Sequence, residues 1–176
     1  MNQLKKSRLW IMVGVPGSGK STWIKDHMKF FATDCKVISR DVIRFSIVNE
    51  DEEYFSKEKE VWNEFVRQAK ESLNYNTDTI VDATHINEAS RTKLLRALAP
   101  ALGGVEINAI VINVSLGTAI DQNEMREGRS LVPESAIERM FDNFTIPDIE
   151  EGFDNIYIYE KEDKKVTYQI IRKEVE

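Results

Sequence analysis

A glycine-rich segment near the start of the chain has residue types and a spacing that suit phosphate binding. The segment reads Gly14-Val15-Pro16-Gly17-Ser18-Gly19-Lys20-Ser21, which is the pattern of glycine, four residues, glycine, lysine and serine. Glycines let successive backbone N–H groups converge without Cβ clashes, and a helix that starts at the lysine directs its positive end to the same point. We therefore predict that this segment binds a nucleoside triphosphate.

Individual side chains of the segment have separable roles at such a site. Lys20 supplies a mobile cation for the outer phosphates, and the Ser21 hydroxyl is a suitable ligand for Mg²⁺. A glycine turn without a ligand is the alternative, but it has no use for a Gly-Lys-Ser run at a helix start. The nucleotide-binding residues predicted here are Gly14, Pro16, Gly17, Ser18, Gly19, Lys20, Ser21 and Thr22.

A carboxylate and an arginine follow the second strand-like run. Asp41 and Arg44 are three residues apart, so a helix that starts here places both on one face. Phosphoryl transfer to an alcohol needs a group that accepts the hydroxyl proton. Asp41 is the candidate general base, and Arg44 is the candidate for holding an anionic acceptor. A helix-terminal Asp with a surface Arg is the alternative interpretation.

Further polar residues follow the third strand-like run. Asp82 ends that run, and an acid there is suited to hold water on Mg²⁺ beside the acceptor. Thr84, His85 and Asn87 come next, and we predict that they line the acceptor pocket. For His85, a neutral polar residue at the start of the next helix is an equally good reading.

Two arginines lie in a polar segment that precedes Pro133. Arg126 and Arg129 have Gly128 between them, which suits a mobile lid at about 117–131 that closes over the triphosphate. Either arginine would bind the donor phosphates and neutralise charge on the transferring group. An exposed polar helix with a surface ion pair is the alternative.

These residues must be positioned by elements that alternate along the chain. Short runs rich in Val and Ile predict strands at 8–15, 36–40, 79–84, 105–114 and 155–159. Helical patterns between them predict helices at 19–31, 41–48, 56–74 and 87–99, and one with Pro133 as its first residue. This alternation predicts a parallel sheet covered by helices on both faces, with ligands at the carboxyl ends of the strands. A C-terminal hairpin at about 154–172 adds an antiparallel edge strand.

Composition limits the class of protein. The chain has 176 residues, of which 41% are hydrophobic and 31% charged, as in a single globular domain. No apolar run approaches the roughly 18 residues of a membrane span. One cysteine and two histidines argue against a disulfide scaffold or a zinc cluster, so we expect a cytoplasmic location.

Charge is unevenly distributed. The net charge is −6, which argues against a protein that grips duplex nucleic acid through a wholly basic surface. Residues 1–48 nevertheless hold nine Lys or Arg against three Asp or Glu, while residues 49–78 hold four against nine. Scatter over a solvated surface is one interpretation, and a basic region that faces a phosphate-rich partner is the other.

With these motifs, the chain resembles the kinase domain of phage-type polynucleotide 5′-hydroxyl kinases and the wider family of small AAA-type P-loop kinases. The resemblance covers about 9–159 and lies in four blocks: Gly14 to Trp23, Ser39 to Ile47, Asp82 to Asn87, and Asn123 to Arg126 with Val132-Pro133. Two positions depart from the family pattern. Gln122 stands where the phage kinase has a second lid arginine, and His85 stands where the family usually has Asn.

The resemblance implies a fold and a set of roles. The implied fold is an adenylate-kinase-like five-stranded parallel sheet with its lid before the Pro133 helix. The implied roles are β- and γ-phosphate binding by Lys20, metal binding by Ser21, general base for Asp41, acceptor-phosphate binding by Arg44, acceptor contact by Thr84 and donor-phosphate binding by the lid residue Arg126.

The expected function follows from these roles. We expect one P-loop kinase domain, 1–176, that uses ATP and Mg²⁺ to phosphorylate the 5′-hydroxyl end of RNA or DNA, with single-stranded ends preferred. A kinase for a small acceptor, such as a nucleoside, nucleotide or sugar, would keep the same loop, base and lid. A non-catalytic module in which nucleotide binding regulates a partner would keep the loop alone.

Overall fold

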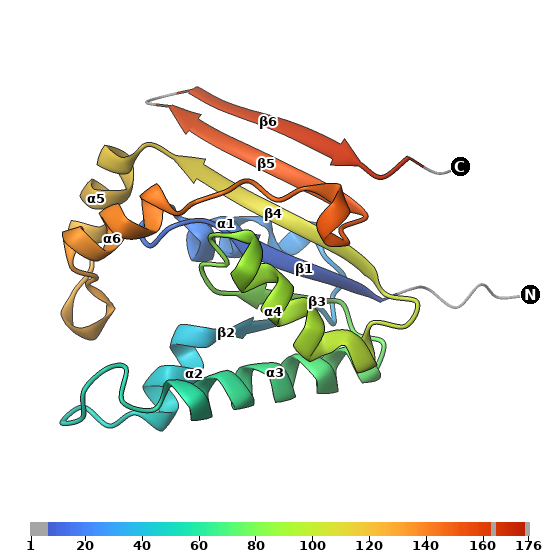
Figure 1. Ribbon diagram of the computed structural model, residues 1–176, viewed down its shortest axis with the longest axis horizontal. Coiled ribbons are helices and arrows are strands. Elements are labelled where there is room, and N and C mark those ends of the chain that lie inside the picture. The colour runs from blue at the N-terminus through green and yellow to red at the C-terminus, as the bar shows by residue number, and fades with distance from the viewer. Residues whose placement is uncertain (1–6, 163–164, 175–176) are drawn as a thin grey trace, which may run out of the picture.

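A mostly parallel sheet forms the centre of the molecule (Figure 1). The computed structural model describes residues 7–162 and 165–174, and within them the strand order is β2-β3-β1-β4-β5-β6. The strands are β1 (Arg8–Val13), β2 (Lys36–Ser39), β3 (Thr79–Asp82), β4 (Glu106–Val114), β5 (Asn155–Glu162) and β6 (Lys165–Arg172). Neighbours from β2 to β5 pair in parallel, and β6 pairs antiparallel with β5.

The predicted fold class is therefore confirmed, including the antiparallel edge strand. The centre of the sheet is made of apolar residues because helices cover both of its faces. All four residues of β3 are buried, as are five of the six residues of β1. The turn of the hairpin, at 163–164, lies outside the described residues.

Helices follow most strands, as the alternation predicted. The α-helices are α1 (Lys20–His27), α2 (Arg40–Ile47), α3 (Glu58–Asn74), α4 (Glu88–Leu98), α5 (Leu116–Glu124) and α6 (Glu134–Asp142). Short 3₁₀ turns are η1 (Met28–Phe30), η2 (Ala99–Ala101), η3 (Gly128–Ser130) and η4 (Ile149–Glu151). Pro133 is the residue before α6 rather than its first helical residue.

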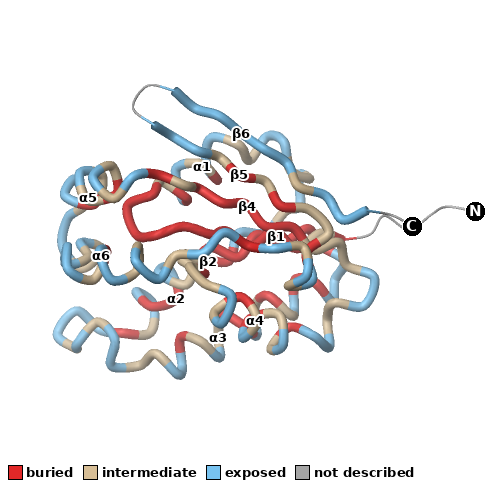
Figure 2. The backbone as a smooth tube through the Cα atoms, turned by 45° about the horizontal axis from the view of Figure 1, so that its top comes forward, coloured by how far each residue is buried: buried red, intermediate tan, exposed pale blue. Residues whose placement is uncertain are grey.

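Two apolar layers hold the helices on the sheet. On one face, Phe65 of α3 and Leu94 of α4 pack with β1 and β4 in a fully buried cluster. On the other face, Ile24 of α1 packs against Trp10 and Met12 of β1. Figure 2 shows the buried strands enclosed between these layers. Burying a Phe or Leu side chain stabilises the fold by about 1.5–3 kcal/mol, so the helical stripes fix the layers.

Asn87 fixes where α4 begins. Its side-chain oxygen accepts a hydrogen bond from the Ser90 N–H at 3.0 Å, and the Ser90 hydroxyl accepts one from the Asn87 N–H at 3.3 Å. This reciprocal pair satisfies two N–H groups that a helix start otherwise leaves without partners. The side chain predicted to start this helix does so, and its side chain is therefore engaged in the cap.

The predicted lid at 117–131 is partly helical. Its first half belongs to α5, whose start is capped by the Ser115 hydroxyl, which accepts a hydrogen bond from the Thr118 N–H at 3.2 Å. Its second half contains η3 and the two arginines. Figure 1 shows α5, α6 and α2 gathered at the end of the sheet where the parallel strands finish. Among the described residues, no helix has both the length and the apolar character to cross a membrane.

Candidate active site

The glycine-rich loop connects β1 to α1 and is shaped by two close approaches. Gly17 has a φ of +80°, and a Cβ placed there would lie 2.0 Å from the carbonyl oxygen of Ala119 in α5. The Gly14 N–H donates a hydrogen bond to the carbonyl of Thr84 at 2.9 Å, which ties the loop to the end of β3. Glycine is therefore required where the loop passes under α5, and the loop cannot move independently of β3.

Lys20 lies over the loop that precedes it. Its ammonium group donates hydrogen bonds to the carbonyl oxygens of Gly14 and Val15, each at 2.9 Å. Burial lowers the pKa of Lys20 to about 8, the nearby carboxylate of Asp82 opposes this shift, and the positive charge of Arg126 adds to it. The amine is thus held where the phosphates of a nucleotide on this loop would lie.

Ser21 and Asp82 meet beside the lysine. The Ser21 hydroxyl donates a hydrogen bond to Asp82 Oδ2 at 2.9 Å. Burial raises the pKa of Asp82, while Lys20 and the Ser21 hydrogen bond act in the opposite direction. Hydroxyl and carboxylate oxygens are the ligands that Mg²⁺ prefers. No three His, Cys, Asp or Glu side chains of the described part of the chain are grouped to hold a metal, so Mg²⁺ here would need phosphate oxygens and water as further ligands.

Asp41 and Arg44 lie together at the start of α2. They form an ion pair, as their three-residue spacing predicted, and the Tyr54 hydroxyl lies 3.2 Å from both Asp41 Oδ1 and Arg44. The side chain of Asp41 is 64% exposed, whereas that of Arg44 is only 6% exposed. The carboxylate thus faces the solvent-accessible side of the pair, and the guanidinium forms its base.

Glu58 holds this pair from α3. Its carboxylate binds Arg44 Nε at 2.7 Å and Arg40 at 2.7 Å. Burial alone would lower the pKa of Arg44, but the hydrogen bonds with Glu58 and Tyr54 raise it above its ordinary value. The sequence analysis did not identify Glu58 or Tyr54. Each is 10 or more positions from its partner, in a segment with no motif of its own.

A small cavity joins the nucleotide loop to this ion-pair cluster. Its volume is about 200 Å³. We call it the central pocket. It is lined by Pro16, Lys20, Ser21, Arg40, Asp41, Arg44, Tyr54, Phe55, Glu58, Asp82, Ala83, Thr84, Arg126, Ser130, Val132 and Met140. Seven predicted site residues thus come together in one pocket: Lys20, Ser21, Asp41, Arg44, Asp82, Thr84 and Arg126.

A second cavity of about 670 Å³ lies on the other side of the loop. It is lined by the loop residues Gly17, Ser18 and Gly19, by Thr22, and by an aromatic group. In that group the rings of Trp23 and His27 are stacked with centroids 4.1 Å apart. Such a shelf suits a flat base, and we call this space the donor cavity. Arg126 lines both the donor cavity and the central pocket, so it lies at the junction between them.

Two predicted site residues lie elsewhere. His85 is buried outside the lining of the central pocket, and its Nδ1–H donates a hydrogen bond to the carbonyl of Met12 at 2.9 Å. Burial lowers the pKa of His85 to about 4, so the ring is neutral. Arg129 donates two hydrogen bonds of 3.1 Å to the carbonyl of Val48 and lines neither the donor cavity nor the central pocket. Of the two lid arginines, Arg126 is the one beside the loop.

Solved structures share this fold at low sequence identity. Kti12 from Chaetomium thermophilum in complex with ADP-AlF3 has a TM-score of 0.68 at 16% identity, over 89% of this chain and 91% of that chain. A chain from the Pnkp1/Rnl/Hen1 RNA repair complex has a TM-score of 0.60 at 23% identity, over 81% of this chain. A gluconokinase from Sinorhizobium meliloti 1021 has a TM-score of 0.55 at 16% identity, over 89% of this chain and 84% of that chain. These similarities establish the fold alone.

The sequence comparisons assign the family. This chain spans only 45% and 42% of the matched chains in the two structures of the Pnkp1/Rnl/Hen1 complex. No curated protein matches it in sequence. A family model described as an AAA domain matches residues 9–147, which include the loop, α2, the end of β3 and the lid. Because that match covers well over half of the chain, the protein belongs to this AAA domain family of P-loop kinases.

Proposed function

We propose that the protein is an ATP- and Mg²⁺-dependent polynucleotide 5′-hydroxyl kinase. The observation that carries the proposal is the composition of the central pocket, which has Lys20 and Ser21 on one side and Asp41 with Arg44 on the other. Lys20 and Asp41 are near enough for the carboxylate to raise the pKa of the amine. A phosphate donor and an alcohol acceptor can therefore meet between them.

The proposed reaction assigns each side chain a step. Asp41 accepts the proton of the acceptor hydroxyl as that oxygen attacks the γ-phosphorus of ATP. A new O–P bond forms, the bond from phosphorus to the β–γ bridging oxygen breaks, and ADP leaves. Lys20 and Arg126 bind the negative charge that develops. Mg²⁺, when bound at Ser21, neutralises charge on the phosphates.

The contacts of Asp41 are compatible with this role. The hydrogen bonds from Arg44 and Tyr54 are both made to Oδ1. Oδ2 makes no hydrogen bond to any side chain or backbone group that the structure describes, and it belongs to an exposed carboxylate. Arg44 also keeps Glu58 as a partner, so a protonated Asp41 does not leave a buried guanidinium unpaired. The geometry supports Asp41 as the base.

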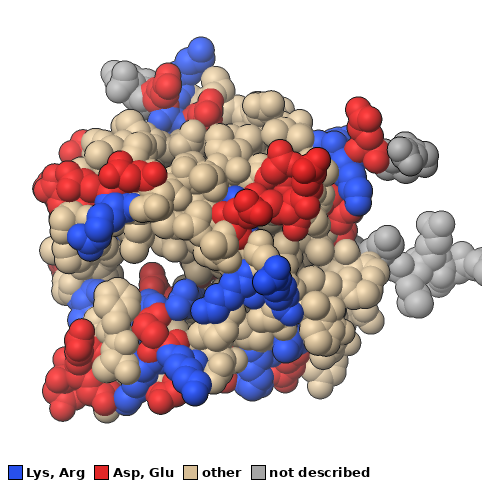
Figure 3. Space-filling model, in the orientation of Figure 1, with Lys and Arg blue, Asp and Glu red and all other residues tan. Residues whose placement is uncertain are grey.

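A basic strip beside the pocket supports a polynucleotide over a small acceptor. Arg40, which lines the pocket, lies 5.7 Å from the ring centroid of Trp62, and Lys93 Nζ of α4 lies 4.5 Å from the same centroid. Arg96 follows one turn later and is exposed like Lys93. Figure 3 shows Lys and Arg side chains gathered in a row beside the hollow in this face. Cations held by an aromatic ring suit the backbone phosphates of a single strand.

The similar structures leave two acceptor classes to compare. A neighbour from an RNA repair complex supports a nucleic acid, whereas a gluconokinase neighbour supports a small polyol. A small acceptor would fill the central pocket and would not use the strip of Arg40, Lys93 and Arg96. The strip therefore favours the polynucleotide.

The test is transfer from radiolabelled ATP to 5′-hydroxyl oligonucleotides of one to ten nucleotides, beside a panel of nucleosides and sugars. We expect kcat/KM to rise with oligonucleotide length. The double variant Lys93→Glu, Arg96→Glu should lose that rise and reduce the salt dependence of KM by about 0.7 per lost phosphate contact. Lys29→Glu, an exposed change on η1, is the matched control. Transfer to nucleosides or sugars alone would contradict the proposal.

A further inference from the structure

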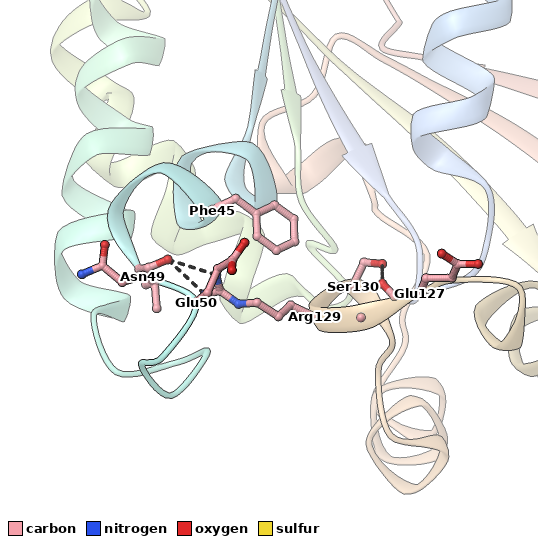
Figure 4. Close-up of a pocket in the computed structure, with 8 residues that line it drawn as sticks. Phe45, Asn49, Glu50, Glu127, Arg129 and Ser130 are labelled. Atoms are coloured by element: carbon pink, nitrogen blue, oxygen red, sulfur yellow. Dashed lines mark hydrogen bonds between the residues drawn. The ribbon is translucent and has the colours of Figure 1, made fainter.

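A third cavity, of about 870 Å³, lies between the lid and the end of α2 (Figure 4). It is lined by Phe45, Val48, Asn49, Glu50, Glu127, Gly128, Arg129 and Ser130, and we call it the lid pocket. Ser130 also lines the central pocket, so the two spaces adjoin. The phosphoryl transfer proposed above assigns no ligand to the lid pocket.

One wall of the lid pocket presents a flat apolar surface. The Phe45 side chain is among the exposed large hydrophobic residues, at 43%. The Arg129 guanidinium lies 5.5 Å from its ring centroid and 5.7 Å from that of Tyr54. Figure 4 shows Phe45 extending from α2 toward the segment that carries Arg129. The two groups come from separate elements and together form a surface on which a planar ring can stack.

The remaining polar groups of the lid pocket mostly accept hydrogen bonds. Two terminal nitrogens of Arg129 are already used, because both donate to the Val48 carbonyl at 3.1 Å (Figure 4). Glu50 and Glu127 are exposed carboxylates, and Asn49 adds an amide. Two negative charges beside one occupied guanidinium disfavour a phosphate group here. They favour a ligand that combines a flat ring with N–H donors.

We infer that the lid pocket binds the base of the acceptor's 5′-terminal nucleotide and prefers bases with an exocyclic amino group. The inference rests on the proposed function. If the terminal sugar occupies the small central pocket beside Asp41, its base must lie in an adjoining space, and the lid pocket is such a space. Adenine and cytosine carry an amino group that donates to a carboxylate, whereas uracil presents a carbonyl oxygen at the corresponding position.

The experiment measures kcat/KM for ten-nucleotide 5′-hydroxyl acceptors that differ only in their first residue: A, C, U or an abasic site. We expect A and C to exceed U by about tenfold, as one good hydrogen-bond discrimination allows, and the abasic acceptor to be the poorest. Phe45→Ala should raise KM for all three bases and leave the abasic acceptor unchanged. Glu50→Gln and Glu127→Gln should reduce the preference for A and C over U.

Controls separate the base pocket from the kinase itself. Phe30→Ala removes another exposed aromatic ring, at 71% exposure on η1, and should change none of these values. Equal kcat/KM for all four acceptors, or a preference for U, overturns the base pocket while the kinase proposal stands. Absence of transfer to every oligonucleotide overturns the proposed function, and the base pocket with it. The Glu50 and Glu127 variants alter exposed side chains, so they test the idea even if Phe45→Ala folds poorly.

Discussion

The side chains of the central pocket differ sharply in their exposure to water. Lys20, on the donor side, is buried and makes hydrogen bonds to two carbonyl oxygens of its own loop. Asp41, on the acceptor side, is largely exposed and is held by Arg44 and Tyr54. The donor side is thus preorganised in a dry environment, and the acceptor side stays open to an incoming hydroxyl.

The lowered pKa of Lys20 predicts how nucleotide affinity depends on pH. The amine is protonated below pH 8 and loses its charge as the pH rises through about 8. Bound phosphates favour the protonated form, so binding above pH 8 takes up a proton, and the Kd for ATP should be about tenfold weaker at pH 9 than at pH 7. Calorimetry in two buffers of different ionisation enthalpy measures both quantities. Lys20→Met should bind weakly without this pH dependence, and a wild-type Kd that is constant from pH 7 to 9 would refute the role.

At the residue scale, motifs predicted the groups of the central pocket but not their supports. The loop pattern identified Lys20 and Ser21, and a three-residue spacing identified Asp41 with Arg44. Glu58 could not be found this way, because its contacts to Arg40 and Arg44 span 18 and 14 positions and depend on how α3 packs against α2.

At the scale of elements, alternation of apolar patterns was sufficient for the sheet but not for the lid. The runs rich in Val and Ile located all six described strands to within a few residues. The helix α5 was missed because Leu116–Glu124 contains a glycine and few apolar residues. Its usable signal was Ser115, an N-cap residue directly after β4.

Asn87 provides a test of how an element start contributes to stability. Asn87→Ala removes the cap of α4, so the free energy of unfolding should fall by about 1 kcal/mol, which lowers Tm by about 2–4 °C for a domain of this size. The central pocket does not include Asn87, so kcat/KM should not change. Thermal unfolding and transfer assays measure the two effects, with Asn87→Ser as the capping-competent control. Loss of activity at an unchanged Tm would instead place this side chain at the acceptor.

At the scale of the whole molecule, the site depends on contacts between neighbouring strands. The Gly14 N–H binds the Thr84 carbonyl, and the His85 ring binds the Met12 carbonyl, so the end of β3 is attached to β1 and to the loop. His85 has a φ of +42°, in the left-handed region. Its ring also faces Phe65 of α3, with centroids 6.2 Å apart. This histidine supports the sheet beneath the pocket.

The buried, neutral His85 predicts a loss of stability in acid. Burial lowers its native pKa to about 4, below the ordinary value of 6.5, so between these values the unfolded chain binds a proton that the native chain does not. Stability from this residue should therefore decline as the pH falls from about 6.5 to about 4, by up to roughly 3 kcal/mol. Urea unfolding at several pH values measures the slope. His85→Asn tolerates the same backbone conformation and should remove this part of the slope, whereas an unchanged slope would contradict the assignment.

The most direct test of the account is phosphoryl transfer by the Asp41→Asn variant, measured beside its affinity for ATP. Asn keeps an oxygen for Arg44 but cannot accept the hydroxyl proton. We predict that kcat for a 5′-hydroxyl oligonucleotide falls by about 10³-fold while the Kd for ATP stays within about twofold of wild type. Undiminished transfer, or loss of ATP binding in parallel with activity, would contradict the claim that this carboxylate is the general base on the acceptor side.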